Sequence, residues 1–259
     1  MLPFSSVLPR PHFFRYPLAA LALLLASCAS PPDAAANRTP STLTEQAPQE
    51  TRTENNEAQA QYHEARRLIR QPGPKDDPGS ALALMEKSAN QGYVKAQTFL
   101  GQMYLTAVGM SAPDLEKAFY WYKKAAENGG QHERMDYAML LSTQRENPAA
   151  VKEGVERLEA LADEKYPPAL FMLSSYYEDG TGREKNTAKA LSLMTEAATA
   201  GEPMAQYMLG LYYLTGKNVK KDRNTAIMWF QQSAKNGSPL AIEELREMGI
   251  PSPSKEPEK

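Results

Sequence analysis

Apolar and small side chains recur with a helical period through residues 58–249. In the segment 118–129 they fall at Ala118, Trp121, Tyr122 and Ala125. This i, i+3, i+4, i+7 spacing places all four on one face of an α-helix. A second kind of segment, such as 205–210, begins with Ala-Gln and ends with Leu-Gly. The pattern predicts helices of two alternating types, joined by turns rich in glycine.

The two helix types repeat along the chain. Ala126, Ala162, Ala198 and Ala234 lie at intervals of 36 residues. A fixed period of 20–50 residues is typical of a solenoid of stacked repeats. In the second helix a small residue that permits close packing recurs at the same position, as Gly101, Ala138, Ser174 and Gly210.

The ends of the repeats also have a pattern. Gly129, Gly201 and Gly237 follow first helices, so we expect them in the left-handed cap conformation. Residues 60–69 match a second helix alone, and residues 241–248 predict a last helix with a polar outer face. Terminal segments of this kind close the ends of repeat arrays.

These segments resemble the Sel1-like repeat, an αα relative of the tetratricopeptide repeat. The motifs here are Ala-xx-Trp-Tyr-xx-Ala-Ala-xx-Gly and Ala-Gln-Tyr-xx-Leu-Gly-xx-Tyr. The resemblance implies an all-α solenoid of αα-hairpins over 58–249, with about four full units plus capping half-units. It is weakest where Glu133 and Asp136 replace apolar residues and where Arg157 replaces the tryptophan.

The N-terminal segment predicts export and lipid attachment. Arg10 and Arg15 precede an apolar run of 11 residues, 17–27. Since a spanning helix needs ~20 apolar residues, this run has the length of a signal-peptide core instead. It ends in Leu-Ala-Ser-Cys, which resembles the bacterial lipobox and implies lipidation of Cys28. Ala29 follows where an aspartate would resemble an inner-membrane retention signal, so we expect the outer membrane, facing the periplasm.

The segments flanking the repeats are polar. Residues 28–57, counted from the lipidated cysteine, are rich in Pro, Ala, Thr, Gln and Glu and predict a flexible tether. At ~5–6 Å × √n its reach is roughly 30 Å. Residues 250–259 predict a disordered tail.

Charge and residue types exclude several classes of function. The chain has 29 Lys and Arg against 31 Asp and Glu, which argues against nucleic-acid binding. Its single cysteine excludes an internal disulfide framework and a cysteine metal cluster. His132-Glu133 begins a zinc-protease motif that fails at Asp136, and we expect His63 and His132 to be solvated. We therefore expect a protein with no catalytic residues, metal or cofactor.

The repeats do predict a surface for a partner protein. Positions 3, 6 and 10 of the first helices vary between repeats, whereas positions 1, 2, 4, 5, 8 and 9 are mostly apolar. Tyr120 and Met228 are the expected anchors, because aromatic residues and methionine are enriched at the centres of interfaces. The other candidates are Lys123, Glu156, Glu159 and Gln231.

Three functions remain open for such a protein. The resemblance to small Sel1-like lipoproteins implies an immunity protein that neutralises a type VI secretion toxin, often a phospholipase. The alternative is an envelope scaffold for polysaccharide export or outer-membrane assembly. A third possibility is an enzyme or small-molecule binder, since some Sel1-like proteins act on β-lactams. Those relatives carry a disulfide in each repeat, whereas this chain has one cysteine.

Overall fold

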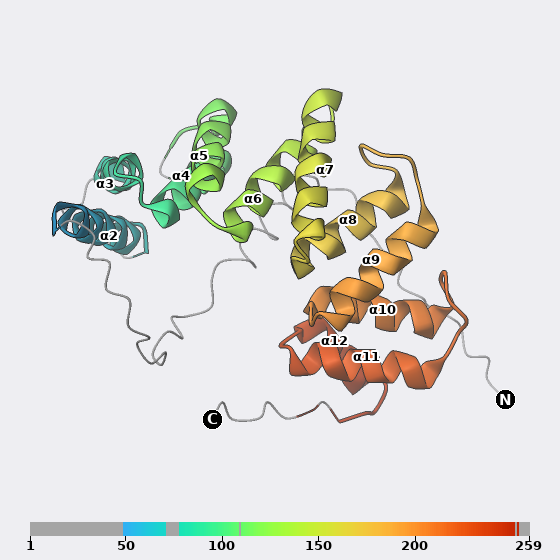
Figure 1. Ribbon diagram of the computed structural model, residues 1–259. Coiled ribbons are helices and arrows are strands. Elements are labelled where there is room, and N and C mark those ends of the chain that lie inside the picture. The colour runs from blue at the N-terminus through green and yellow to red at the C-terminus, as the bar shows by residue number, and fades with distance from the viewer. Residues whose placement is uncertain (1–48, 71–77, 109, 252, 254–259) are drawn as a thin grey trace. The chain divides into compact units, whose positions relative to one another are not determined.

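The computed structural model describes residues 49–70, 78–108, 110–251 and 253. Over these residues it has eleven helices and no strand, so the predicted all-α fold is confirmed (Figure 1). The predicted signal peptide, Cys28 and residues 29–48 of the tether lie outside the described part. The chain divides into two compact units, one ending at Ala118 and one beginning at Phe119. This boundary falls within helix α5 (Leu115–Asn128).

Unit 1 contains α2 (Gln49–Arg70), α3 (Pro78–Asn90), α4 (Val94–Thr106) and the start of α5. Helix α3 packs against both α2 and α4. The predicted tether reached residue 57, which is wrong for its last part because α2 already begins at Gln49. Nucleation is the costly step of helix formation, and each residue added to a formed helix gains a hydrogen bond. The packed half of α2 therefore supports an extension of the helix toward its N-terminus.

Unit 2 contains the rest of α5 and seven further helices. These are α6 (Gln131–Ser142), α7 (Pro148–Asp163), α8 (Pro167–Asp179), α9 (Thr187–Thr199), α10 (Pro203–Thr215), α11 (Arg223–Lys235) and α12 (Pro239–Glu247). From α6 to α12 each helix packs against the next one in sequence (Figure 1). This is the αα-hairpin stacking that the 36-residue period predicts.

Local sequence sets where the helices of unit 2 begin. The first-type helices α7, α9 and α11 follow Asn147, Asn186 and Asp222, whose side chains accept hydrogen bonds from backbone N–H groups of the first turn. The second-type helices α8, α10 and α12 begin with proline, whose missing N–H costs nothing there. The hairpins α7–α8, α9–α10 and α11–α12 therefore have start signals of two kinds, neither of which was predicted.

The predicted helical face is buried. Ala118, Trp121, Tyr122 and Ala125 are at most 8% exposed. At the C-terminal end, Phe230 is fully buried in a cluster with Ala226, Ala234, Ala241 and Leu245. The ring of Phe230 lies so close to Gly210 that an added Cβ there would come within 2.6 Å of it. The recurring small residue thus makes room for an aromatic ring at this position.

The prediction for the turn glycines is confirmed for two of three residues. Gly201 and Gly237 have φ angles of +94° and +89°. Gly129 is not among the residues with positive φ, so this prediction was wrong. Its N–H still bonds to the carbonyl of Ala125 at 2.8 Å, and a Cβ at Gly129 would lie 2.7 Å from the side chain of Glu133. Glycine is therefore required there by a close approach and not by backbone conformation.

Two of the three departures from the repeat motif have a structural role. Glu133 accepts a hydrogen bond from the N–H of Gly130 at 2.9 Å and so caps its own helix. Arg157 lies over the ring of Tyr137, 5.1 Å from its centroid, and pairs with Glu153 at 2.8 Å. Asp136 is buried, with 5% of its surface exposed.

Helices α6 and α7 approach each other closely at Gly154. A Cβ at this position would lie 2.6 Å from the carbonyl oxygen of Ala138 and 2.7 Å from the backbone nitrogen of Ser142. Backbone atoms cannot move aside as a side chain can. We expect Gly154→Ala to lower the free energy of unfolding by about 1–2 kcal/mol, although alanine favours an isolated helix over glycine.

Urea denaturation followed by circular dichroism measures this effect, with Lys152→Ala on the exposed face of α7 as the control. A stabilised Gly154→Ala protein would show that the two helices are not in close contact.

The C-terminal helix differs from its prediction. Glu243, Arg246 and Glu247 are exposed, but so are Leu240 and Ile242, each at 41%. The outer face is therefore mixed and not simply polar. Ile250, expected in the disordered tail, packs against the cluster around Phe230, and its N–H bonds to the carbonyl of Leu245 at 2.9 Å.

Candidate partner-binding surface

The variable positions of the first helices are solvent-accessible, as predicted. We call positions 3, 6 and 10 of the first helices in unit 2 the variable stripe. Its members are Tyr120, Lys123, Glu127, Glu156, Glu159, Asp163, Ser192, Thr195, Thr199, Met228, Gln231 and Lys235. All are exposed except Glu159, which is half-buried.

The two predicted anchors are large apolar side chains exposed to solvent. Tyr120 on α5 is 53% exposed, and Met228 at the same repeat position on α11 is 45% exposed. The ring of Tyr120 packs edge-on against Trp121, with 5.0 Å between centroids. Such a contact restrains the ring, so little side-chain entropy remains to be lost on binding.

The polar candidates differ in whether they already form hydrogen bonds or ion pairs within the chain. Lys123 and Gln231 are exposed, and Glu156 faces Lys152 at 3.9 Å in a solvated pair. Glu159 accepts a hydrogen bond from the hydroxyl of Tyr177 at 3.0 Å and forms an ion pair with Arg183. Its carboxylate joins α7 to α8 and the following loop, which leaves it less available than the others to a partner.

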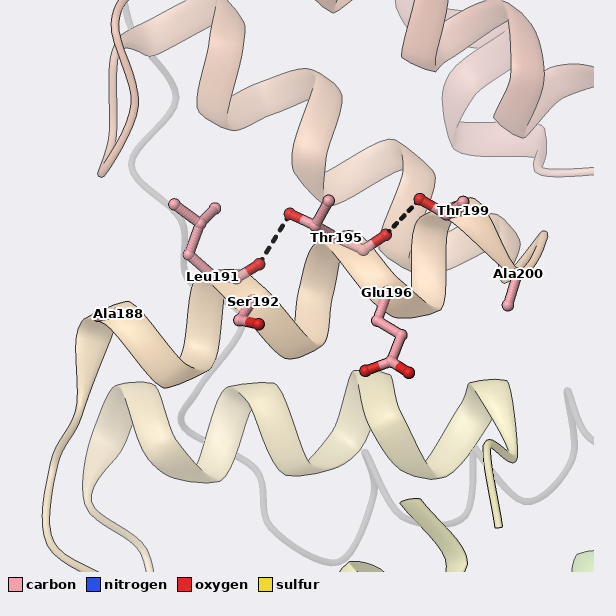
Figure 2. A pocket seen from close by; sticks show the side chains of 7 residues that line it. All are labelled: Ala188, Leu191, Ser192, Thr195, Glu196, Thr199 and Ala200. Carbon is pink, nitrogen blue, oxygen red and sulfur yellow. Dashed lines mark hydrogen bonds between the residues drawn. The ribbon is translucent and has the colours of Figure 1, made fainter. Parts of the chain in front are cut away.

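A shallow hollow of about 740 Å³ lies along helix α9. Three members of the variable stripe, Ser192, Thr195 and Thr199, help to line it, together with Ala188, Leu191, Glu196 and Ala200 (Figure 2). The hydroxyls of Thr195 and Thr199 donate to the carbonyls of Leu191 and Thr195, each at 2.8 Å (Figure 2). These hydroxyls are therefore already satisfied. The hollow was not predicted, although the run of small residues on α9 was a visible signal.

Ion pairs and a hydrogen bond join neighbouring hairpins of unit 2. Lys165, after α7, pairs with Glu196 on α9 at 2.6 Å. Tyr212 on α10 donates a hydrogen bond to Glu178 on α8 at 2.5 Å, and Lys217 pairs with the same carboxylate. Burial and the bond to Glu178 raise the pKa of Tyr212 well above its usual value. The hydroxyl of Tyr212 therefore stays protonated and donates its hydrogen bond to Glu178, which is a structural role.

The two histidines in the described part of the chain, His63 and His132, belong to no metal-binding cluster. His63 is exposed, as predicted. The side chain of His132, also expected to be solvated, is 40% exposed, and its Nε2 lies 3.7 Å from Oδ2 of the buried Asp136. Within the described ranges there is no cluster of three His, Cys, Asp or Glu side chains fit to hold a metal ion.

The described part of the chain also has no helix that could cross a membrane. None of the helices between residues 49 and 251 is both long and apolar enough to span a bilayer.

Stacked helix pairs with a varied exposed face define a class of helical repeat proteins that bind other proteins. A profile of the Sel1 repeat matches residues 58–93, 94–130, 167–202 and 203–238, and the chain belongs to the Sel1 repeat family. The profile passes over residues 131–166, where α6 and α7 nevertheless form a hairpin. This gap contains Glu133, Asp136 and Arg157, the three departures from the motif.

Solved structures of Sel1 repeat proteins resemble this chain. A Sel1 repeat protein from Oxalobacter formigenes is 26% identical, with 74% of this chain and 78% of that chain covered and a TM-score of 0.60. A protective antigen of uropathogenic Escherichia coli is 28% identical, with 76% of this chain covered but only 42% of its own length, at a TM-score of 0.59.

Another similar structure is an immunity protein from Pseudomonas aeruginosa, at 25% identity with 71% of this chain and 67% of that chain covered. Its TM-score of 0.48 is too low to indicate a shared function. No curated protein sequence matches this chain.

Proposed function

We propose that this protein is a non-catalytic lipoprotein that captures a partner protein through its variable stripe. Tyr120 and Met228 carry this proposal. In the first helices of unit 2 the other large apolar side chains are buried or half-buried, whereas these two are about half exposed at the same repeat position. Exposed aromatic and methionine side chains on a rigid helix are typical anchors of protein interfaces.

Replacing either anchor should weaken binding without unfolding the protein. We expect Tyr120→Ala and Met228→Ala each to reduce partner affinity by about 2 kcal/mol, because each removes a desolvated apolar contact. The partner is first obtained by affinity capture from the membrane fraction, and its affinity is then measured by calorimetry.

Leu240→Ala is the matched control, since Leu240 is exposed to a similar degree but lies off the variable stripe on α12. Unchanged affinity of both stripe variants, with intact circular dichroism spectra, would remove this surface from the proposal.

We further propose that Cys28 holds the protein in the outer membrane, facing the periplasm, and that the partner is a type VI secretion toxin of the phospholipase class. The lipobox-like sequence before Cys28 supports the anchor. A stable lipid anchor would concentrate an inhibitor at the membrane, where a phospholipase acts. This is the specific role that the resemblance to small Sel1-like lipoproteins implies.

Competition between sister cells tests the immunity role. Cells that lack this protein should be killed by toxin-producing siblings, and the wild-type gene should rescue them. Cys28→Ala is the location control, and Tyr120→Ala with Met228→Ala tests the surface. Unaffected competition, together with copurification of export or assembly machinery, would support the envelope scaffold instead.

A further inference from the structure

A row of cationic and imidazole side chains lies along the last two turns of α2, in unit 1. His63, Arg66, Arg67 and Arg70 are spaced i, i+3, i+4, i+7 and line a hollow of about 290 Å³. This spacing places them on one side of the helix. The side that packs into unit 1 instead contains Ala58, Gln61, Tyr62, Ala65 and Leu68, all buried. We call the four outward residues the α2 cationic face.

Contacts within unit 1 organise this face. The guanidinium of Arg66 lies over the rings of Tyr62 and Phe99, 5.5 and 5.6 Å from their centroids, and its Nη1 donates to the hydroxyl of Tyr62 at 3.2 Å. Arg67 forms a two-point ion pair with Glu64, at 2.7 and 2.9 Å. Arg66 is therefore held in place by aromatic rings, and Glu64 offsets one of the three arginine charges.

The sign of this charge differs from that of the rest of the chain. The whole chain has a formal net charge of −2, yet the α2 cationic face with Glu64 has a surplus of positive charge. Lys95 lies one turn before Phe99 on α4, the helix whose ring stacks on Arg66, and is exposed. A local positive surplus of this kind attracts phosphate groups.

The place of α2 in the sequence indicates which phosphates these are. It is the first helix of the described chain and follows Cys28, whose lipidation belongs to the proposed function. The anchor would keep α2 within reach of the membrane, and each cationic group that meets the surface of an anionic membrane contributes about 1 kcal/mol. We infer that the α2 cationic face binds the headgroups of anionic phospholipids and so holds unit 1 against the membrane surface.

Vesicle binding without the lipid anchor tests this inference separately from the proposed function. The mature chain, residues 28–259, is prepared with Cys28→Ala and mixed with vesicles of phosphatidylcholine and phosphatidylglycerol, or of phosphatidylcholine alone. We expect binding to the mixed vesicles only, and its loss at high salt because surface charges are then screened. Equal binding to both kinds of vesicle would overturn the inference.

Matched charge variants locate the contact. Arg67→Gln with Arg70→Gln should weaken binding to mixed vesicles by about 25-fold, or about fivefold per charge. Lys152→Gln with Lys189→Gln removes the same charge from exposed positions in unit 2 and should leave binding unchanged. An equal loss in both double variants would show a diffuse charge effect and overturn the inference.

Inorganic phosphate separates a membrane contact from a site for a soluble anion. If phosphate raises the melting temperature of the Cys28→Ala chain but not of the same chain with Arg67→Gln and Arg70→Gln, and mixed vesicles do not bind, the face is a soluble-phosphate site and the inference is wrong. Because every arm lacks the lipid anchor and the partner, failure here leaves the variable stripe untouched. Loss of partner capture would likewise leave vesicle binding unchanged.

Discussion

Phe230→Ala is expected to lower the free energy of unfolding by about 3–5 kcal/mol. Phe230 is fully buried, and its ring contacts the cluster of Ala226, Ala234, Ala241 and Leu245. It also lies 5.7 Å from the ring of Tyr207, centroid to centroid. Removing the ring takes away this apolar contact and leaves a cavity between α10, α11 and α12 that rigid helices fill poorly.

Met228→Ala, two residues earlier on the same helix, is the matched control. Its side chain is 45% exposed, so we expect its removal to change stability by less than about 1 kcal/mol while reducing partner affinity. Urea denaturation followed by circular dichroism compares the two variants. Equal stabilities would contradict the buried position of Phe230.

Asp136→Asn is expected to raise the free energy of unfolding by about 2–3 kcal/mol at pH 8 and to change it little near pH 4. Burial raises the pKa of Asp136 to about 6, His132 opposes this shift, and Glu133 adds to it. Tyr122 from α5 faces the same carboxylate, and burial is the main reason that its own pKa is also raised.

The direction of the pH effect follows from the raised pKa. Well below pH 4 the carboxyl group of Asp136 is protonated in both the folded and the unfolded chain and costs nothing. Between about pH 4 and pH 6 the unfolded chain gives up this proton while the folded chain keeps it, and above pH 6 the folded state must hold a buried carboxylate. The ionisation of Asp136 therefore lowers the free energy of unfolding as the pH rises from about 4 to about 7.

The difference between wild type and variant, measured from pH 4 to pH 8, isolates Asp136 from the other carboxylates. Asp163→Asn, at an exposed position on α7, is the control and should change stability by less than about 0.5 kcal/mol at every pH. A constant difference across this range would mean that Asp136 ionises in the folded protein as it does in water.

Most of the fold could be predicted because it depends on local periodicity. The spacing of Ala118, Trp121, Tyr122 and Ala125 predicted a buried helix face, and all four are buried. The 36-residue period predicted the succession of hairpins. The predictions were wrong where a single turn or helix end departed from the repeat pattern. These places are Gly129, the start of α2 and Ile250. Such positions depend on one or two contacts that an average repeat pattern does not contain.

The candidate surface was predicted less completely. Exposure of Tyr120 and Met228 follows from their place in the repeat, and whether they bind a partner stays a prediction. The engagement of Glu159 with Tyr177 and Arg183 was not predicted, because those residues come from the next helix and from a loop. The α9 hollow was not predicted, because it depends on the space beside α9 as well as on the sizes of the side chains along that helix.

The sequence by itself determined that the chain folds into paired helices, which face of the repeated helices is buried and which positions vary on the exposed face. These properties follow from the 3.6-residue turn of the helix and the 36-residue repeat, both of which can be recognised in a single sequence. Only the tertiary structure decided that Asp136 is buried, that Gly154 lies against the backbone of α6 and that Arg66 stacks on Phe99. Each of these depends on the distance between two helices, which is fixed by how whole side chains pack and not by the order of polar and apolar residues.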